Sequence, residues 1–360
     1  MLAIQPWNEV LWDRLVQTNR SLPPGLLFAG PAGLGKDALA LRLAAWYLCS
    51  STTDTAEPCG TCQSCRLVSA GTHPDLHIVQ SEMANAKAKS PFAELGRRYL
   101  SIESTSRSAK PKSIIGVNPI RALITALLSH AHFGHGKVAL ISPAERMNTN
   151  SANALLKLLE EPADGTLLVL VSSMPTRLLA TIRSRCMRVE FAPPAVPMAV
   201  DWLVPRVGSD AEALLALAGG APLGAAALSE NGFPGCRDEW LDDVAALASR
   251  ALDPLTCASR WHQAGAAMVL EWLHGLVADL IGLASGATPP RLFNLGFENQ
   301  ILALTGGIPA AALHDLFDTI GRQRRILDGS VDERLLVEDI VIKLRETLIG
   351  HGPNTIQLAG

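Results

Sequence analysis

The sequence predicts an α/β fold with a parallel sheet and a phosphate-binding loop, followed by helical domains. Three observations predict it. Short apolar runs alternate with helical patterns as far as residue 192, a glycine-rich run stands between the first strand and the first long helix, and no strand pattern follows. Strands that alternate with helices form parallel sheets with helices on both faces.

The glycine-rich run has the pattern G-x-x-x-x-G-K. It follows an apolar run at 25–29, which predicts a buried strand, and it precedes a helical pattern at 36–48. In such a loop the backbone N–H groups and the helix N-terminus hold phosphates, and the lysine reaches the β- and γ-phosphates. The residues expected to form the loop are Gly30, Gly33, Gly35 and Lys36.

The rest of the α/β domain, residues 1–192, follows the same alternation. Residues 81–112 are polar, with few large apolar side chains, and we expect a mobile insertion there. The remaining predicted strands are 76–80, 137–141, 166–171 and 187–191, and the predicted helices between them are 117–130, 150–161 and 176–183.

Beyond the proline-containing stretch at 192–197 the pattern is helical. We expect a small helical domain at 193–231, a larger all-α domain at 232–350 and a tail at 351–360. Tryptophans at helical positions in the larger domain are expected in its core and interfaces.

The residues that ATP hydrolysis requires are missing. Active P-loop ATPases hold Mg²⁺ with a Ser or Thr directly after the lysine and an Asp at the end of a second strand. Here Asp37 follows the lysine, and the strand 137–141 runs into Ser142 and Pro143. Glu145 comes too late to replace the acid in the unshifted register. We therefore expect no hydrolysis by this chain alone, while weak nucleotide binding stays open.

Four of the seven cysteines are clustered in the sequence. Four thiolates suit a tetrahedral structural zinc with no open coordination position. An Fe–S cluster and a redox pair are the alternatives. The expected ligands, within a module at 49–65, are Cys49, Cys59, Cys62 and Cys65.

Charge and hydropathy restrict the class of protein. The net charge is −3, and a protein that grips DNA with its own surface is usually more basic. We find no apolar run typical of a membrane span and no signal-peptide pattern at the N-terminus, so we expect a cytoplasmic protein.

Several segments together resemble the delta-prime family of bacterial DNA polymerase III clamp-loader subunits. The resemblance is dense over about residues 20–195 and weaker afterwards, where 334–340 resembles the family's final helix. Besides the phosphate loop and the cysteine module, the segments that carry it are Gly71–Asp75 (GTHPD), Asn153–Pro162 (NALLKLLEEP) and Ile182–Cys186 (IRSRC).

The resemblance implies an AAA+ (RecA-like) domain, a helical lid at 193–231 and a helical collar at 232–350. It also implies a non-hydrolysing stator in a pentameric ring with tau/gamma and delta subunits, which places a sliding clamp on primed DNA as part of the DNA-directed DNA polymerase III holoenzyme, a nucleotidyltransferase. Arg185 is the residue that would reach, in trans, the γ-phosphate held by a neighbouring tau/gamma subunit. The segment 218–225, where active relatives carry a second arginine sensor, has no arginine.

Two other functions are compatible with parts of the sequence. A catalytically active tau/gamma-like ATPase would explain the phosphate loop, but Asp37, Ser142 and Pro143 argue against it. A zinc-dependent DNA-binding protein would explain the cysteines, but the acidic net charge argues against that function.

Overall fold

The structure is a computed structural model of the 360-residue chain, which forms two compact units, Met1–Pro193 and Pro194–Gly360. The residues that it describes are 4–17, 22–51, 57–88, 92–100, 111–133, 136–286, 292–327 and 331–349.

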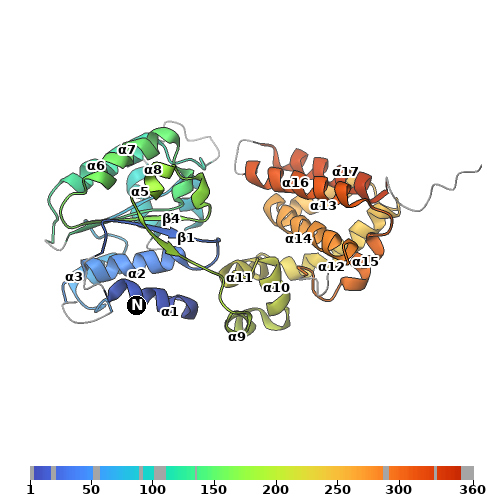
Figure 1. The fold of residues 1–360 in the computed structure, drawn as a ribbon, viewed down its shortest axis with the longest axis horizontal. Helices are drawn as coiled ribbons and strands as arrows, with labels where there is room; N and C mark the ends of the chain where they lie inside the picture. The colour runs from blue at the N-terminus through green and yellow to red at the C-terminus, as the bar shows by residue number, and fades with distance from the viewer. Residues whose placement is uncertain are drawn as a thin grey trace, which may run out of the picture. The chain divides into compact units, whose positions relative to one another are not determined.

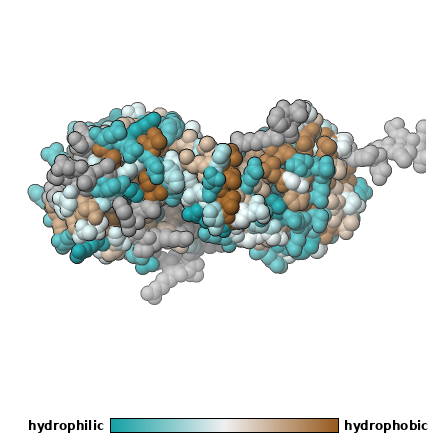
Figure 2. Space-filling model, turned by 90° about the horizontal axis from the view of Figure 1, so that it is seen from below, coloured by the Kyte–Doolittle hydropathy of each residue, from teal (hydrophilic) through white to brown (hydrophobic). Residues whose placement is uncertain are grey.

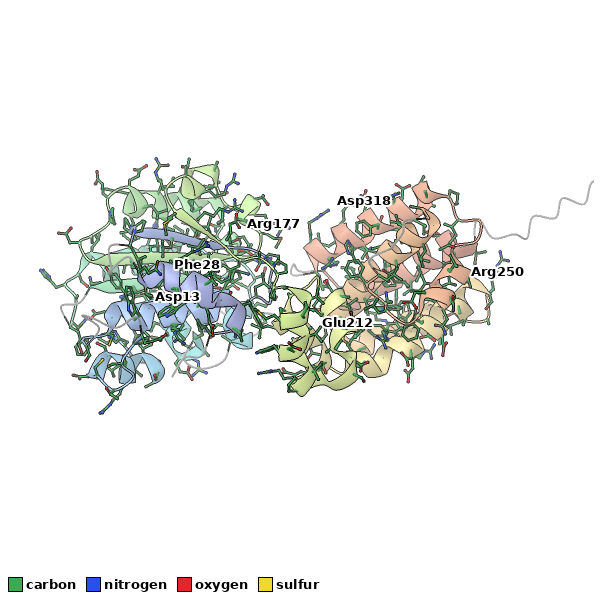
Figure 3. The ribbon with its side chains drawn as sticks, turned by 60° about the horizontal axis from the view of Figure 1, so that its bottom comes forward. Asp13, Phe28, Arg177, Glu212, Arg250 and Asp318 are labelled. Atoms are coloured by element: carbon green, nitrogen blue, oxygen red, sulfur yellow. The ribbon has the colours of Figure 1, made fainter. Side chains whose placement is uncertain are left out.

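The first unit contains a five-stranded parallel sheet in the order β2-β3-β4-β1-β5. The strands are almost wholly buried apart from β5 at one edge, which explains why they read as continuous apolar runs. Phe28, labelled in Figure 3, lies in an inner strand, between the third strand of the order and the edge strand β5, and is completely buried. The strands are β1 (Gly25–Ala29), β2 (Leu76–Val79), β3 (Lys137–Ile141), β4 (Thr166–Ser172) and β5 (Met187–Glu190).

Helices cover both faces of the sheet, as predicted (Figure 1). One face carries α1 (Glu9–Val16), α2 (Lys36–Leu48) and α3 (Gln63–Ser69). The other face carries α6 (Val117–Leu128), α7 (Thr149–Glu160) and α8 (Ala180–Arg183), whose apolar side chains share one core with strands β1 to β4. The short 3₁₀ helices of this unit are η1 (Pro6–Asn8), η2 (Ala144–Arg146) and η3 (Pro175–Arg177).

The strand order determines which loops meet. Strand β1 pairs with β4 on one side and with β5 on the other, and β3 pairs with β4. All strands are parallel, so the segments that follow β1, β3 and β4 leave the sheet on the same side, at the carboxyl ends of the strands. The phosphate loop therefore faces the residues that follow Ile141 and Ser172.

The structure differs from the expected insertion at 81–112. It forms two helices there, α4 (Glu82–Lys87) and α5 (Phe92–Leu100), and α5 packs beside the edge strand β2. Tyr99 is buried, and its hydroxyl lies 2.8 Å from Nδ1 of His77 in β2. Helix α5 has 9 residues, fewer than the windows of about 11–18 residues over which helical periodicity is judged. Residues 89–91 and 101–110 lie outside the described residues.

The second unit is helical throughout its described residues, as predicted. One hydrophobic core runs through it from Ala199 to Leu348, so the core shows no break at the boundary expected near residue 231. Trp240, Trp261 and Trp272 are buried in this core with their ring centroids 5.1–5.9 Å apart.

The helices of this unit are α9 (Val196–Val207), η4 (Gly208–Asp210), α10 (Ala211–Leu217), α11 (Pro222–Glu230), α12 (Phe233–Ala248), α13 (Pro254–Ala264), α14 (Ala266–Ala284), α15 (Glu298–Leu304), α16 (Ala310–Ile326) and α17 (Glu333–Ile349).

Among the described residues, one helix, α14, is long and apolar enough to cross a membrane by length and composition. More than half of its most apolar stretch is buried inside the helical unit, as expected for the central helix of a bundle. On the face drawn in Figure 2, hydrophilic residues predominate and apolar residues form short, separate patches. The apolar character of α14 is thus explained by its place in the core.

Candidate functional site

The phosphate loop has the backbone that its sequence predicts. It joins the end of β1 to the first residue of α2, and Gly30, Gly33 and Gly35 have φ values of 148°, 76° and 87°. A close contact also requires the first of these glycines. A Cβ on Gly30 would lie 2.2 Å from the carbonyl oxygen of Phe191, a backbone atom that cannot easily move, whereas Gly35 is required by its positive φ.

The side chain of Lys36 lies against this loop. Its Nζ donates hydrogen bonds to the carbonyl oxygens of Gly30, at 2.8 Å, and of Pro31. Only 5% of the residue is exposed, and burial lowers the pKa of the amine, while the charges of Asp37 and Glu145 oppose that shift. The lysine thus interacts with the loop's own carbonyl groups, at the place where a P-loop lysine would meet phosphate.

Asp37 and Ser142 contact each other, although 105 positions separate them in the sequence. The hydroxyl group of Ser142 donates to Oδ1 of Asp37 at 2.6 Å. Asp37 is exposed by surface area, yet the protein atoms around its carboxyl group desolvate it and raise its pKa. The hydrogen bond from Ser142 and the charge of Lys36 oppose this rise. The two departures from an ATPase pattern are therefore one hydrogen-bonded pair.

This pair is an exchange of two chemical groups. Active P-loop ATPases place a hydroxyl group at the start of the helix and a carboxylate at the end of the second strand, and the two hold Mg²⁺. Here the carboxylate of Asp37 starts the helix and the hydroxyl group of Ser142 ends the strand. The hydroxyl group of Ser142 donates directly to the carboxylate of Asp37.

Glu145 lies nearer to the phosphate loop than the sequence suggests. Its Oε1 accepts a hydrogen bond of 3.1 Å from the backbone N–H of Ser173, directly after β4. Its charge acts on both Lys36 and Asp37, and Oε2 is buried with no hydrogen-bond partner among the described residues. Glu145 reaches this position because the 3₁₀ turn η2 brings it back toward the carboxyl ends of the strands.

The N-terminal segment also covers the loop, which the sequence did not indicate. Trp7 Nε1 and Asn8 Nδ2 donate to the carbonyl oxygen of Leu34, at 3.0 and 2.8 Å. Asn8 and Leu34 are both buried. These contacts tie η1 to the backbone of the phosphate loop over 26 and 27 sequence positions, a pairing that no local pattern reveals.

The four clustered cysteines meet in space as predicted. Their sulfur atoms all lie within 4.8 Å of one another, with Cys49 and Cys62 3.8 Å apart and Cys59 and Cys65 4.0 Å apart. Four thiolates at ~2.3 Å from one zinc ion are separated by ~3.8 Å in a regular tetrahedron. The cluster can therefore hold a metal ion and is compatible with structural zinc.

Backbone N–H groups point at these sulfur atoms. Those of Cys62 and Cys65 donate to Sγ of Cys59 and Cys62, at 3.3 and 3.4 Å. The first of these bonds, with contacts from Thr61, lowers the pKa of Cys59 to about 5. The turn between Cys59 and Cys62 depends on Gly60, whose φ is +71°. Burial opposes ionisation of Cys62, but hydrogen bonds outweigh it and lower its pKa, whereas burial raises the pKa of Cys65. The module therefore favours the thiolate, the form that binds metal, at Cys59 and Cys62.

Glu57 attaches the cysteine module to the rest of the first unit. Its Oε1 accepts a hydrogen bond of 3.1 Å from Nε1 of Trp12, and its Oε2 pairs with Arg42. Arg42 lies over the ring of Trp12, 4.9 Å from the centroid, and Trp12 packs edge-on against Trp46. If the module became disordered, α1 and α2 would therefore lose these contacts and be destabilised.

Arg185 lies on the surface, just after α8. Its Nη2 is 2.5 Å from Oε1 of Glu160, and its Nη1 donates to the carbonyl oxygen of Thr181 at 3.0 Å. About 35% of its side chain is exposed. Arg188, three residues further along the chain, pairs with Glu190. The structure thus gives Arg185 an ion pair as well, on a side chain that remains accessible.

The neighbouring Cys186 anchors this segment. It is buried, and burial raises the pKa of its thiol to about 11, so it stays protonated. A Cβ on Gly25 would lie 3.3 Å from the carbonyl oxygen of Arg185 and 3.4 Å from Sγ of Cys186. The start of β1 thus packs closely on the backbone that carries Arg185.

The segment Gly71–Asp75 has a structural role among the described contacts. The buried carboxylate of Asp75 accepts the backbone N–H groups of His132 and Phe133 at 2.9–3.1 Å, and Nδ1 of His73 accepts the N–H of Asp75. Burial alone would raise the pKa of Asp75, but these hydrogen bonds outweigh it and lower the pKa. The segment fixes the start of β2 to the loop that follows α6.

Comparison with known proteins agrees with this architecture. The family model described as "DNA polymerase III, delta subunit" matches residues 7–195, and the one described as "DNA polymerase III, delta subunit, C terminal" matches residues 236–346. Together these matches cover most of both units.

Curated relatives extend the comparison. The chain is 36% identical to DNA polymerase III subunit delta' of Pseudomonas aeruginosa, over 76% of this chain and 75% of the relative. It is 30% identical to the subunit of the same name from Escherichia coli, over 95% and 96%. It is also 32% identical to DNA polymerase III subunit tau of Escherichia coli, over 45% of this chain and 20% of that protein.

Proposed function

This chain belongs to the family of DNA polymerase III delta-prime subunits, and we propose that it is the non-hydrolysing stator of a clamp loader. In this role it joins tau/gamma and delta subunits in a pentameric ring in the cytoplasm. The ring uses ATP to place a sliding clamp on primed DNA during replication. The chain itself serves as a rigid scaffold, and the ATP is held by its neighbours.

The observation that carries the proposal is the contrast between two sites of the first unit. At the phosphate loop, the Asp37–Ser142 hydrogen bond joins the two positions that would hold Mg²⁺. At the surface, Arg185 presents an accessible guanidinium group after α8. A guanidinium group neutralises charge on a transferring phosphoryl group and can act from a neighbouring subunit. The chain is thus built to complete another subunit's ATP site.

Nucleotide is bound weakly or not at all by this chain in our proposal. Gly30, Gly33, Gly35 and Lys36 keep the backbone and the charge of a phosphate loop. A bound triphosphate would lie beside the carboxylate of Asp37, however, and like charges in a partly desolvated site repel each other. Its Mg²⁺ would also have to separate the hydrogen-bonded pair.

The metal of the cysteine module is zinc in our proposal, with a structural role. Cys49, Cys59, Cys62 and Cys65 would supply all four ligands, which leaves no position for substrate. The module lies at the α1–α2 face of the sheet, linked through Glu57, so its role is to hold that layer together.

An active tau/gamma-like ATPase is the second candidate, and Glu145 is the observation that favours it. The carboxylate lies close enough to Lys36 and Asp37 to act on their charges. One of its oxygens, however, accepts the N–H of Ser173, and Asp37 still replaces the metal-binding hydroxyl group. The stator explains these contacts better.

Reconstitution tests the proposed function. Purified tau and delta from the same bacterium, with the clamp, primed DNA and ATP, are compared with and without this chain. We expect the chain to join them in one complex on gel filtration and to raise the clamp- and DNA-stimulated ATPase rate about tenfold or more, because it completes an ATP site. A chain that fails to co-elute with tau and delta, or that joins them without any rise in rate, would contradict the proposal.

Restoring the ordinary order of the two exchanged groups tests the account of the phosphate loop. In the double variant Asp37→Thr/Ser142→Asp we expect Mg²⁺ to strengthen ATP binding about tenfold or more, because a hydroxyl group and a carboxylate again stand where P-loop ATPases have them. Titration calorimetry with and without Mg²⁺ measures the change. The single variant Ser142→Asp is the control, since it places two carboxylates together. Equal Mg²⁺ dependence in the double variant and the native chain would show that the exchange does not limit binding.

A further inference from the structure

The side chain of Arg185 is held at two points. Glu160, the last residue of α7, places Oε1 2.5 Å from Nη2, and the carbonyl oxygen of Thr181 in α8 accepts from Nη1 at 3.0 Å. The two contacts come from different helices and reach different nitrogens of the guanidinium group. Together they restrict both its position and its orientation.

The backbone behind these contacts is fixed in the core. Leu159, which precedes Glu160, and Ile182, which follows Thr181, are both buried in the core beneath α7 and α8. The backbone N–H of Arg185 donates to the carbonyl oxygen of Ile182 at 3.1 Å. The arginine is therefore a surface side chain that starts from a rigid base.

The contacts of Arg185 with Glu160 and Thr181 leave some of its N–H donors free to bind a further anion. A guanidinium group has five N–H donors, and each Nη carries two of them. The contact with Glu160 uses Nη2 and the contact with Thr181 uses Nη1. One N–H on each of these nitrogens, and the one on Nε, remain for a phosphate oxygen. An incoming phosphate can thus bind without displacing Glu160.

We propose that Glu160 is the positioning residue of Arg185. It holds the guanidinium group in one orientation before the neighbouring subunit's ATP arrives. A group that is already oriented does not have to be ordered in the transition state, and misplacement by about 1 Å can cost about 100-fold in rate. This inference rests on the proposed function, and it gives the acidic end of the segment Asn153–Pro162 a role in the neighbour's reaction.

The rival interpretation is that the ion pair is only a surface contact. Exposed ion pairs often contribute little to stability, and about 49% of the Glu160 side chain is exposed. The two interpretations differ in what a change at Glu160 does to turnover. They also differ in whether that change acts through Arg185.

Variants of the reconstituted complex separate the two. In Glu160→Ala we expect kcat of the clamp- and DNA-stimulated ATPase to fall about three- to tenfold, with KM for ATP within about twofold. Glu160→Gln keeps an acceptor oxygen and should lose less. The control is Glu161→Ala, which changes the adjacent exposed acid and should match the native complex. If Glu160→Ala does not enter the complex, Glu160→Gln is the variant that is measured.

A double variant tests whether the effect runs through the arginine. Glu160→Ala/Arg185→Ala should be no slower than Arg185→Ala alone, because a positioning residue has no effect without the group that it positions. A rate for Glu160→Ala that equals or exceeds the native rate would overturn the inference, as would losses that multiply in the double variant. If Arg185→Ala lowers the rate and Glu160→Ala does not, only this inference is wrong. If Arg185→Ala itself has no effect at full assembly, the proposed function fails together with it.

Discussion

Replacing Arg185 with alanine should slow hydrolysis of the neighbouring subunit's ATP by about 10³-fold or more, because arginines that act in trans contribute about 10³–10⁵ in rate. The complex should still assemble, since the side chain lies on the surface, where it pairs with Glu160 and donates to the carbonyl oxygen of Thr181. Rapid-quench measurement of ATP hydrolysis should show a burst that lacks the contribution of one site. The other ATP sites of the ring should still hydrolyse their ATP in that burst.

Arg188→Ala is the matched control for this prediction. Arg188 lies three residues away, is exposed and pairs with Glu190 on the edge strand. Its loss removes the same charge from the same surface, so it should leave the burst unchanged. A full burst from a fully assembled Arg185→Ala complex would remove Arg185 from the mechanism.

Removing metal from the cysteine module should destabilise the first unit by several kcal/mol. Structural zinc sites of four thiolates contribute on the order of 10 kcal/mol in isolated peptides, and a module inside a larger domain loses part of that. Glu57 and Arg42 connect the module to α1 and α2, so the loss should spread beyond residues 49–65. Thermal unfolding of Cys59→Ser, and of chelator-treated native protein, measures the effect.

Metal content and a distant cysteine provide the controls. Fresh native protein should contain about one equivalent of zinc. Cys236→Ser changes a partly exposed cysteine in the helical unit and should leave both zinc content and melting temperature unchanged. Less than about half an equivalent of zinc in fresh native protein, or an unchanged melting temperature after its removal, would count against a four-thiolate zinc site.

The sheet and the phosphate loop could be predicted because their signals are local. Strands β1 to β4 are each a short, mostly apolar run that the structure buries, and the loop motif lies between one strand and one helix. The cysteines also lie close together in sequence, which left few alternatives to a shared site.

Contacts between distant residues could not be predicted in the same way. The hydrogen bond between Ser142 and Asp37 joins positions 105 apart, and in sequence the two residues looked like separate losses. The return of Glu145 depends on the turn η2, and the partner of Arg185 depends on how α7 packs against α8. Helix α5 was missed because its 9 residues, of which Leu95 and Tyr99 are buried, are too few for helical periodicity to be recognised with certainty. In each case the tertiary structure supplies a partner that the local pattern does not contain.

Turnover by the isolated chain is the most direct test of the central claim that this subunit does not hydrolyse ATP itself. Purified chain, with Mg²⁺ and ATP but without other subunits, should release phosphate no faster than a no-enzyme blank, because Asp37 and Ser142 bind each other where the metal ligands belong. Clear Mg²⁺-dependent release that Lys36→Ala abolishes would contradict the account and would favour the active ATPase.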